Sequence, residues 1–374
     1  MTSNDHYEAI QNQMQDDRRT IVKFFGGYIV RVTFMCIAAS GCGPDAKATS
    51  PVFRSNAVSA TRLSMGSTLT LTAWTRQDQE PAAKAAFDDV FDEFARLETL
   101  MSTWIPESDV SRINRGAGVE AVPASAEVRD VLAIARQVSE WTGGKFDVTF
   151  GALSGLWKFD HDQDNVIPDM DLVRARLPLI DYRAIRVNDA AGTVFIARKG
   201  ISIHLGGIGK GYALDRAAGI LRRRGVHDFM VQSGGDIYVS GMKDGHPWRL
   251  GIQDPRGAAN RSFAELDLSD GTFSTSGDYE RSFLKDGRRY HHILDPSTGE
   301  PARGTRSVTI VANRAVLADA LSTGVFLLGP DAGMALIERL PDVDGVIVSD
   351  RNEVLISSGL RAKVRIVAPP TDAP

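Results

Sequence analysis

Two stretches of the chain repeat apolar residues at the spacing of an amphipathic helix. The first covers residues 87–101, and the second begins at Ser125 and ends at the glycines of positions 143 and 144. Side chains three and four positions apart share one face of a helix, so each stretch predicts a helix that packs against a core. The apolar positions are Phe87, Val90, Phe91, Phe94, Leu97, Leu100 and Met101, and then Val128, Val131, Leu132, Ala135 and Val138.

Short apolar runs bounded by turn residues predict strands in much of the remaining chain. A hairpin is expected over residues 185–197, with its turn at 188–192. Further strands are expected at 69–75, 201–205, 230–231, 237–239, 248–252, 263–268, 290–294 and 307–312, and further helices at 211–224, 315–328 and 331–340. Since strands and helices follow no regular βαβ rhythm, the predicted class is α+β, with mixed or antiparallel sheets and interspersed helices.

Composition and charge narrow the classes of function. The 374 residues are 43% hydrophobic and 24% charged, which is enough apolar material for a sizeable core. A net charge of -4 gives no electrostatic footprint for nucleic acid. The only cysteines are Cys36 and Cys42, which excludes a disulfide framework and a cysteine-rich metal site. Residues 63–365 are interpreted as one catalytic unit with two lobes, followed by a C-terminal tail at 366–374.

The N-terminal residues resemble an export signal. Small residues lead directly to Cys42 in the run 39–42, which resembles a bacterial lipobox whose cysteine is lipidated. Arg18 and Arg19 resemble a twin-arginine signal. The apolar run between these arginines and Cys42 is too short, and too often interrupted by polar residues and glycines, to form a membrane-spanning helix. We therefore expect an export signal at 1–41, a flexible tether at 42–62, and anchoring to the bacterial inner membrane facing the periplasm. An ordinary cleaved signal or a disordered N-terminus is the alternative.

A glycine-rich stretch at residues 205–213 lies where a strand is expected to lead into a helix. Glycines there let the backbone approach an anion, and a helix N-terminus favours phosphate. The stretch is not a P-loop, because Lys210 is followed by Gly211 where that motif has Ser or Thr. Taken alone, a tight structural turn explains it equally well.

One carboxylate stands on an otherwise apolar helix. Asp319 lies within the predicted helix 315–328, and Thr323 follows one turn later on the same face. An unpaired buried charge is costly, so Asp319 must reach solvent or bind a cation. One carboxylate and one hydroxyl suit Mg²⁺, which keeps waters and takes phosphate oxygens. The alternative is an exposed aspartate beside a threonine bonded to its own helix.

Two adjacent histidines, His291 and His292, lie in a predicted strand. Alternation along a strand sends them to opposite faces, so at most one points into a given cleft. A histidine in a cleft could act as a general base, whereas a satisfied core or edge residue is the commoner role.

Taken together, the motifs resemble the ApbE family of FAD:protein FMN transferases, in the order typical of that family. They are MGST from Met65, LMSTW ending at Trp104, GGKFDVTFGAL from Gly143, HLGGIGKGYALD from His204, QSGGDIYVSG from Gln232, STSGDYER from Ser274, HHILDPSTG from His291 and ADALSTG from Ala318. The resemblance covers nearly all of the chain after residue 63. Family members are commonly periplasmic lipoproteins, which agrees with the interpretation of Cys42.

The resemblance also implies roles for individual residues. His292 is implied as the catalytic base, and the backbone of Gly207 with Asp319 and Thr323 as the Mg²⁺ ligands. The residues implied to bind FAD are Met65, Trp104, Lys145, Phe146, Asp147, His204, Lys210 and Leu294. Two of them depart from the family pattern: position 204 is usually acidic, which puts recognition of the adenosine half in doubt, and position 104 is usually Tyr. Tryptophan keeps a ring for stacking.

The implied reaction is Mg²⁺-dependent transfer of FMN from FAD to a threonine of a partner protein, with release of AMP. The expected partners are FAD and acceptor flavoproteins such as subunits of membrane redox complexes. Two alternatives remain at this point. The same site could hydrolyse FAD with water as the nucleophile, or the chain could bind flavin without turnover.

Overall fold

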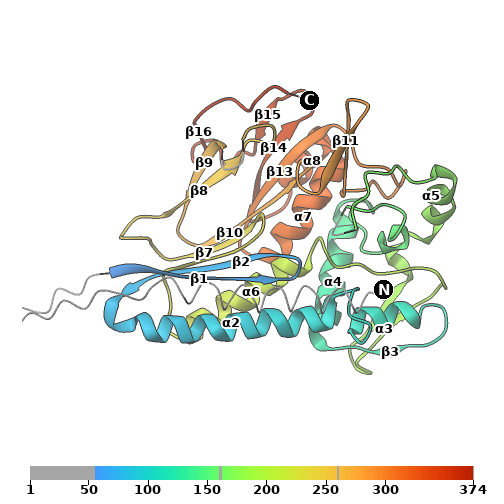
Figure 1. Cartoon of the computed structure of the whole chain (residues 1–374), viewed down its shortest axis with the longest axis horizontal. Coiled ribbons are helices and arrows are strands. Elements are labelled where there is room, and N and C mark those ends of the chain that lie inside the picture. Colours follow the sequence, from blue (N-terminus) through green and yellow to red (C-terminus); the bar gives the residue numbers. More distant parts are fainter. Residues whose placement is uncertain (1–54, 160–161, 259–260, 374) are drawn as a thin grey trace, which may run out of the picture. The chain divides into compact units, whose positions relative to one another are not determined.

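The largest element of the fold is an antiparallel sheet. The computed structural model describes residues 55–159, 162–258 and 261–373, and in them eight strands pair in the order β1-β2-β6-β7-β10-β13-β14-β15 (Figure 1). The strands are β1 (Ser55–Ser64), β2 (Ser67–Arg76), β6 (Phe229–Ser233), β7 (Asp236–Ser240), β10 (Gly271–Gly277), β13 (Thr305–Ala312), β14 (Val343–Ser349) and β15 (Val354–Ile356).

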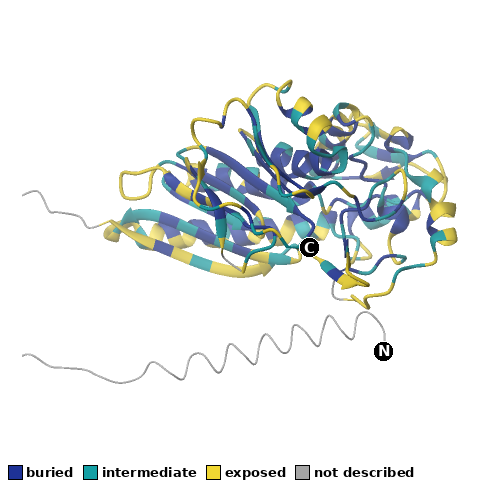
Figure 2. Cartoon of the chain, turned by 90° about the horizontal axis from the view of Figure 1, so that it is seen from above, coloured by how far each residue is buried: buried dark blue, intermediate teal, exposed yellow. Residues whose placement is uncertain are grey.

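Helices cover one face of this sheet and enclose the main core with it (Figure 1). The α-helices are α2 (Glu80–Met101), α3 (Asp109–Arg115), α4 (Ala126–Trp141), α5 (Met170–Arg176), α6 (Gly209–Arg223), α7 (Ala315–Leu328) and α8 (Pro330–Ile337). Short 3-10 turns occur at Gln77–Gln79, Gly151–Leu153, Leu177–Leu179 and Tyr182–Ala184. The apolar stripes of α2 and α4 are buried as their periodicity predicts, except for half-buried Leu100. Buried residues gather in the interior of the described structure (Figure 2). No helix among the described residues is long and apolar enough to span a bilayer.

A smaller sheet, β16-β9-β8, encloses a second core on the other face of the large sheet. Its strands are β8 (Trp248–Gln253), β9 (Ser262–Leu268) and β16 (Arg365–Ile366). Alternation along β14 shows how both faces are used. Ile347 belongs to the helix-covered core, whereas Val346 and Val348 belong to the second core. A central strand buried on both faces is expected to be apolar at nearly every position.

Two further small sheets complete the fold. The hairpin β11 (Ser282–Lys285) and β12 (Arg288–His291) lies over a third apolar cluster, in which Phe283 and Tyr290 stack. The sheet β3-β5-β4 contains β3 (Val122–Pro123), β4 (Ile185–Asn188) and β5 (Thr193–Ile196). The last two strands confirm the hairpin predicted over residues 185–197.

The strand predicted at residues 201–205 is wrong. Only Ser202 makes an isolated bridge, to Phe150. The side chain of Asn114 takes both backbone groups of Ile203, accepting its N–H at 2.7 Å and donating to its carbonyl at 2.9 Å. The backbone groups that a strand would use are therefore occupied by a side chain, and the apolar run lies in a loop.

Two other boundaries also differ from prediction. The strand expected at 290–294 is β12, which ends at His291, because the N–H of His292 turns to the carbonyl of Arg281. The tether expected at 42–62 is wrong for residues 55–62, which belong to β1 and pair with β2. The exposed side of β1 is polar, with hydroxyl pairs such as Ser59–Thr72. The sequence of β1 therefore shows little of the apolar periodicity that predicts a strand. The export signal and lipobox lie outside the described residues.

Candidate active site

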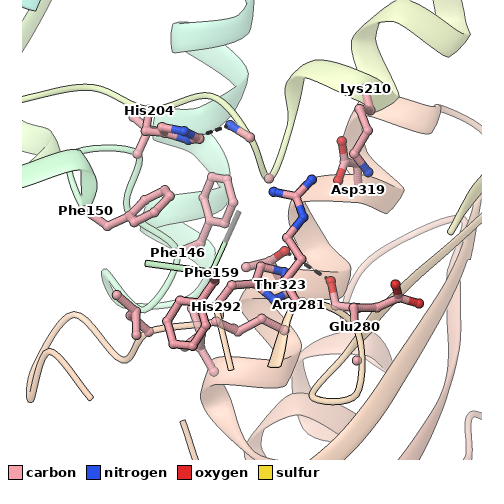
Figure 3. A pocket seen from close by; sticks show the side chains of 18 of the residues that line it. Phe146, Phe150, Phe159, His204, Lys210, Glu280, Arg281, His292, Asp319 and Thr323 are labelled. Atoms are coloured by element: carbon pink, nitrogen blue, oxygen red, sulfur yellow. Dashed lines mark hydrogen bonds between the residues drawn. The ribbon is translucent and has the colours of Figure 1, made fainter. Parts of the chain in front are cut away.

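A cavity of about 260 Å³ lies where the start of α6, helix α7, strand β10 and the residue after β12 meet. Figure 3 shows Arg281 entering its middle, with Lys210 and Asp319 on one side and aromatic rings on the other. A second cavity of about 130 Å³ adjoins the first, since both are lined by His204, Gly206, Lys210 and Arg281. The two cavities together offer a polar centre between partly apolar walls, the usual character of a ligand site.

Lys210, in the first turn of α6, lies between two carboxylates. Its ammonium group pairs with Asp236 at the start of β7, and Asp319 of α7 also acts on it. Burial alone would lower the pKa of Lys210, but the two carboxylates outweigh burial and raise it. Lys210 is therefore a permanent positive charge in the cavity.

Asp319 is buried, with 4% of its surface exposed. Burial raises the pKa of Asp319 to about 7, and the nearby charge of Asp236 adds to this rise, while Lys210 and the N–H of Gly211 oppose it. The exposed-aspartate alternative is thereby excluded. Because burial disfavours the charge of Asp319, a cation bound beside this carboxylate would stabilise its ionised form.

A chain of hydroxyl groups ties α7 to β10 beside this cluster. Ser276 bonds to Ser322 at 2.8 Å and to Thr323 at 3.1 Å, and Ser274 bonds to Asp236. The Thr323 hydroxyl thus points to the neighbouring strand and the cavity rather than to its own helix. A Cβ placed on Gly207 would lie 3.5 Å from that hydroxyl, so the backbone of Gly207 runs close beside it.

These oxygen groups fit Mg²⁺ in kind. Asp319 supplies a carboxylate, Thr323 a hydroxyl and Gly207 a backbone carbonyl, and all three residues line the cavity. Among the described residues no group of three or more His, Cys, Asp or Glu side chains could hold a metal by itself. Such a sparse set matches a cation that keeps waters and takes phosphate oxygens from a substrate.

Of the two histidines, only His292 lines the cavity. Its Nδ1 is buried and makes no hydrogen bond to any described residue. Burial lowers the pKa of His292 to about 3, and the positive charges of Arg281 and Lys210 add to the effect. The ring is therefore neutral at ordinary pH.

His291 has a structural position. Its Nε2 bonds to the carbonyl of Ala302 at 3.0 Å, and its ring packs edge-on against Phe326. The expectation that at most one of the two histidines enters the cleft is therefore confirmed.

Comparison with known proteins identifies the family of this chain. The family model described as ApbE matches residues 65–347. This chain belongs to the ApbE family.

Named ApbE-family relatives agree over most of their length. A FAD:protein FMN transferase of Treponema pallidum is 33% identical over 306 residues, which cover 77% of this chain and 84% of the relative. One from Klebsiella pneumoniae is 31% identical over 275 residues, or 73% of this chain and 85% of the relative.

Solved ApbE structures share the fold. The ApbE protein of Thermotoga maritima has a TM-score of 0.75 at 33% identity. The match covers 83% of this chain and 100% of the Thermotoga chain. The flavin transferase ApbE of Vibrio cholerae has a TM-score of 0.74 at 27% identity, with 83% of this chain and 100% of that one covered. The predicted family and the α+β class are both confirmed.

The residues expected to form an ApbE-type site come together from distant parts of the chain. Met65 and Trp104 line the smaller cavity, and His204 and Lys210 line both. The larger cavity is lined by Lys145, Phe146, Asp147, Gly207, His292, Leu294, Asp319 and Thr323. Their individual roles stay predictions, and Cys42 lies outside the described residues.

Two of these side chains are already engaged within the protein. Both carboxylate oxygens of Asp147 accept backbone N–H groups, from Thr149 and Tyr182, each at 2.8 Å. Lys145 is held by Asp295 at 2.7 Å. The side chain of Asp147 therefore holds the backbone of two neighbouring segments, while Lys145 fastens one loop of the wall to another.

Sequence reasoning assigned no role to Asp236, Glu280 and Arg281, which also line the cavity. All three lie in motifs that carry the family resemblance. Asp236 follows two glycines at the start of a strand, a position that places a charge at the end of a buried sheet. The sequence therefore could have indicated Asp236 as a site residue. Its pairing with Lys210 could be seen only in the structure.

Proposed function

We propose that this protein transfers FMN from FAD to a threonine hydroxyl of a partner protein, with Mg²⁺, and releases AMP. The family and its named relatives support flavin transfer to a protein. The observation that carries the finer proposal is the convergence of neutral His292, cationic Lys210 and the Asp319–Thr323 pair on one cavity.

The chemistry is a phosphoryl transfer in which bonds and protons balance. The threonine oxygen attacks the FMN phosphorus, forming a new P–O bond, while the P–O bond to AMP breaks. The imidazole ring of His292 accepts the threonine proton, and AMP leaves with the electron pair of the broken bond. The product is a phosphoester between FMN and threonine.

The remaining residues stabilise charge and orient the substrate. Lys210 stays protonated and faces the region where phosphate charge would lie. Asp236 holds the Lys210 ammonium in place. Asp319, Thr323 and the Gly207 carbonyl would hold Mg²⁺, which neutralises pyrophosphate charge when bound. Proton transfer to His292 becomes easier as phosphate anions offset the neighbouring cations that lower its pKa.

Two alternatives use the same cavity. A FAD pyrophosphatase would take water as the nucleophile, and a flavin carrier would bind without turnover. The deciding experiment is to co-express the protein with a candidate acceptor domain and analyse that acceptor by mass spectrometry. We expect the mass of FMN on a threonine, whereas free FMN and AMP with an unmodified acceptor would indicate the pyrophosphatase.

We also propose that the protein acts at the periplasmic face of the inner membrane, anchored by lipid on Cys42. The run of small residues before Cys42 and the paired arginines upstream support this. A location there would bring the enzyme to acceptor subunits of membrane redox complexes.

A further inference from the structure

Helix α7, which carries Asp319 and Thr323, has no cap from the residue that precedes it. Arg314 makes no side-chain bond to the helix start. The cap comes instead from α6, where the carboxylate of Asp215 accepts the N–H groups of Ala315 at 2.7 Å and Val316 at 3.1 Å. The first N–H groups of a helix lack partners within the helix, so this carboxylate satisfies two of them from another element.

The converse contact is made one turn along each helix. Asp319 of α7 accepts the N–H of Gly211, in the first turn of α6, at 2.8 Å. Residues 211 and 215 of α6 therefore face residues 319 and 315 of α7, so the helices run antiparallel here and each caps the other. Along each helix the two contacting residues are four positions apart, so they lie on the same face of that helix.

The two helices are in very close contact at this point. A Cβ on Gly211 would lie 2.3 Å from the carbonyl oxygen of Ala315 and 2.7 Å from the Cβ of Asp319. Contacts this short leave little freedom to slide one helix along the other, because packed interiors are not continuously deformable. The bond from Asp215 thus sets where α7 begins relative to α6.

We propose that Asp215 is a positioning residue that holds Asp319 and Thr323 in register for the cation. The inference rests on the proposed function, because it assumes that those two side chains bind Mg²⁺. Asp215 lines neither of the two cavities. Its effect is transmitted through the first turn of α7, one turn before Asp319 and two turns before Thr323.

The test compares Asp215→Ala and Asp215→Asn with a matched control, Asp109→Ala. Asp215 is half-buried and Asp109 is buried. Asp109 likewise accepts a backbone N–H at the start of a helix, that of Ser125 at 2.6 Å, and it lines neither cavity. Three quantities are measured for each full-length protein. They are the melting temperature, the Mg²⁺ concentration that gives half-maximal flavin transfer, and Mn²⁺ binding followed by electron paramagnetic resonance.

We expect Asp215→Ala to raise the half-saturating Mg²⁺ concentration and weaken Mn²⁺ binding by about ten- to a hundredfold, as loss of a group that orients metal ligands usually does. Excess Mg²⁺ should restore much of the rate. Asp215→Asn keeps one acceptor and should fall between wild type and Asp215→Ala, so it carries the comparison if Asp215→Ala does not fold. Asp109→Ala should lower the melting temperature and leave cation binding unchanged.

The inference is overturned if the Asp215 variants lose stability while Mg²⁺ and Mn²⁺ dependence stay as in wild type, or if Asp109→Ala shifts the cation dependence equally. Failure of the underlying proposal looks different. In that case the wild-type protein itself would transfer flavin equally well with a chelator present, and would bind no Mn²⁺.

Discussion

Lys210 and Asp236 form an ion pair inside the cavity, although 26 positions separate them in the chain. Lys210 begins a helix and Asp236 begins a strand, and the pair joins the two elements at the wall of the site. Removal of one partner of a buried pair leaves an uncompensated charge and costs about 3–5 kcal/mol. The pair is therefore a structural contact that fixes the Lys210 ammonium group at the wall of the cavity.

Asp236→Asn should lower the melting temperature and weaken FAD binding. The amide keeps the shape and can still accept from Ser274, but the Lys210 ammonium loses its ion pair and keeps only the charge of Asp319 nearby. Fluorescence titration with FAD measures the loss. Asp164→Asn is the control, because the Lys158–Asp164 pair is exposed and solvent screens such pairs. Equal effects of the two substitutions would argue against a special role for Asp236.

His292→Ala should abolish flavin attachment while FAD binding persists. A threonine hydroxyl is very weakly acidic, so loss of the base should slow attack by about a hundred- to ten-thousand-fold. Water is abundant, so slow Mg²⁺-dependent release of FMN and AMP should remain. Fluorescence of the acceptor band after electrophoresis reports the transfer. A wild-type rate in this variant would place the base elsewhere.

His291→Ala tests the neighbouring position and serves as the comparison. We expect a lower melting temperature, because the bond to Ala302 and the packing on Phe326 are lost. The rate of transfer per folded molecule should stay close to that of wild type. A collapse of transfer without loss of stability would mean that His291 takes part in the chemistry.

The two histidines also predict acid sensitivity of the free protein. Burial lowers the pKa of His291 to about 4 and of His292 to about 3, against about 6.5 in the unfolded chain. Between these values the unfolded chain binds more protons, so stability falls as the pH drops below about 6.5. His292→Gln should lose less stability than wild type between pH 7.5 and pH 5, measured by thermal melting. An identical loss would contradict a depressed pKa at His292.

Asp319→Ala should remove Mg²⁺-dependent turnover with little loss of stability. Its carboxylate is buried with a raised pKa, so its charged form is unfavourable in the free protein, which offsets the lost bond to Gly211. Assays with and without Mg²⁺, together with thermal melting, test both statements. Activity of the wild type that resists chelation would refute the metal assignment.

Cys42→Ser should move the protein from the membrane fraction to the soluble fraction, or block its processing. A single thioether-linked lipid site would be lost, and no described helix could replace it as a spanning anchor. Fractionation followed by N-terminal sequencing provides the measurement. A wild-type protein that is already soluble and starts elsewhere than Cys42 would show that the lipobox interpretation is wrong.

Local periodicity was enough to find most helices and strands. The stripes of α2 and α4 and the hairpin 185–197 are visible in the sequence because helical and strand spacing is a property of neighbouring residues. The family was also recognisable, since its motifs keep their order along the chain. By contrast, β1 shows little apolar alternation. The apolar run at 201–205 lies in a loop because the side chain of Asn114 binds its backbone, and no local pattern reveals that contact.

Contacts between distant segments were decided by tertiary structure. Sequence analysis found Asp319 and Thr323 because they lie one helical turn apart, and it separated His292 from His291 because neighbours in an extended chain point apart. It could not pair Lys210 with Asp236, or Asp215 with the start of α7 a hundred positions later. Those pairings depend on which elements pack together, and many long-range contacts acting at once determine that packing.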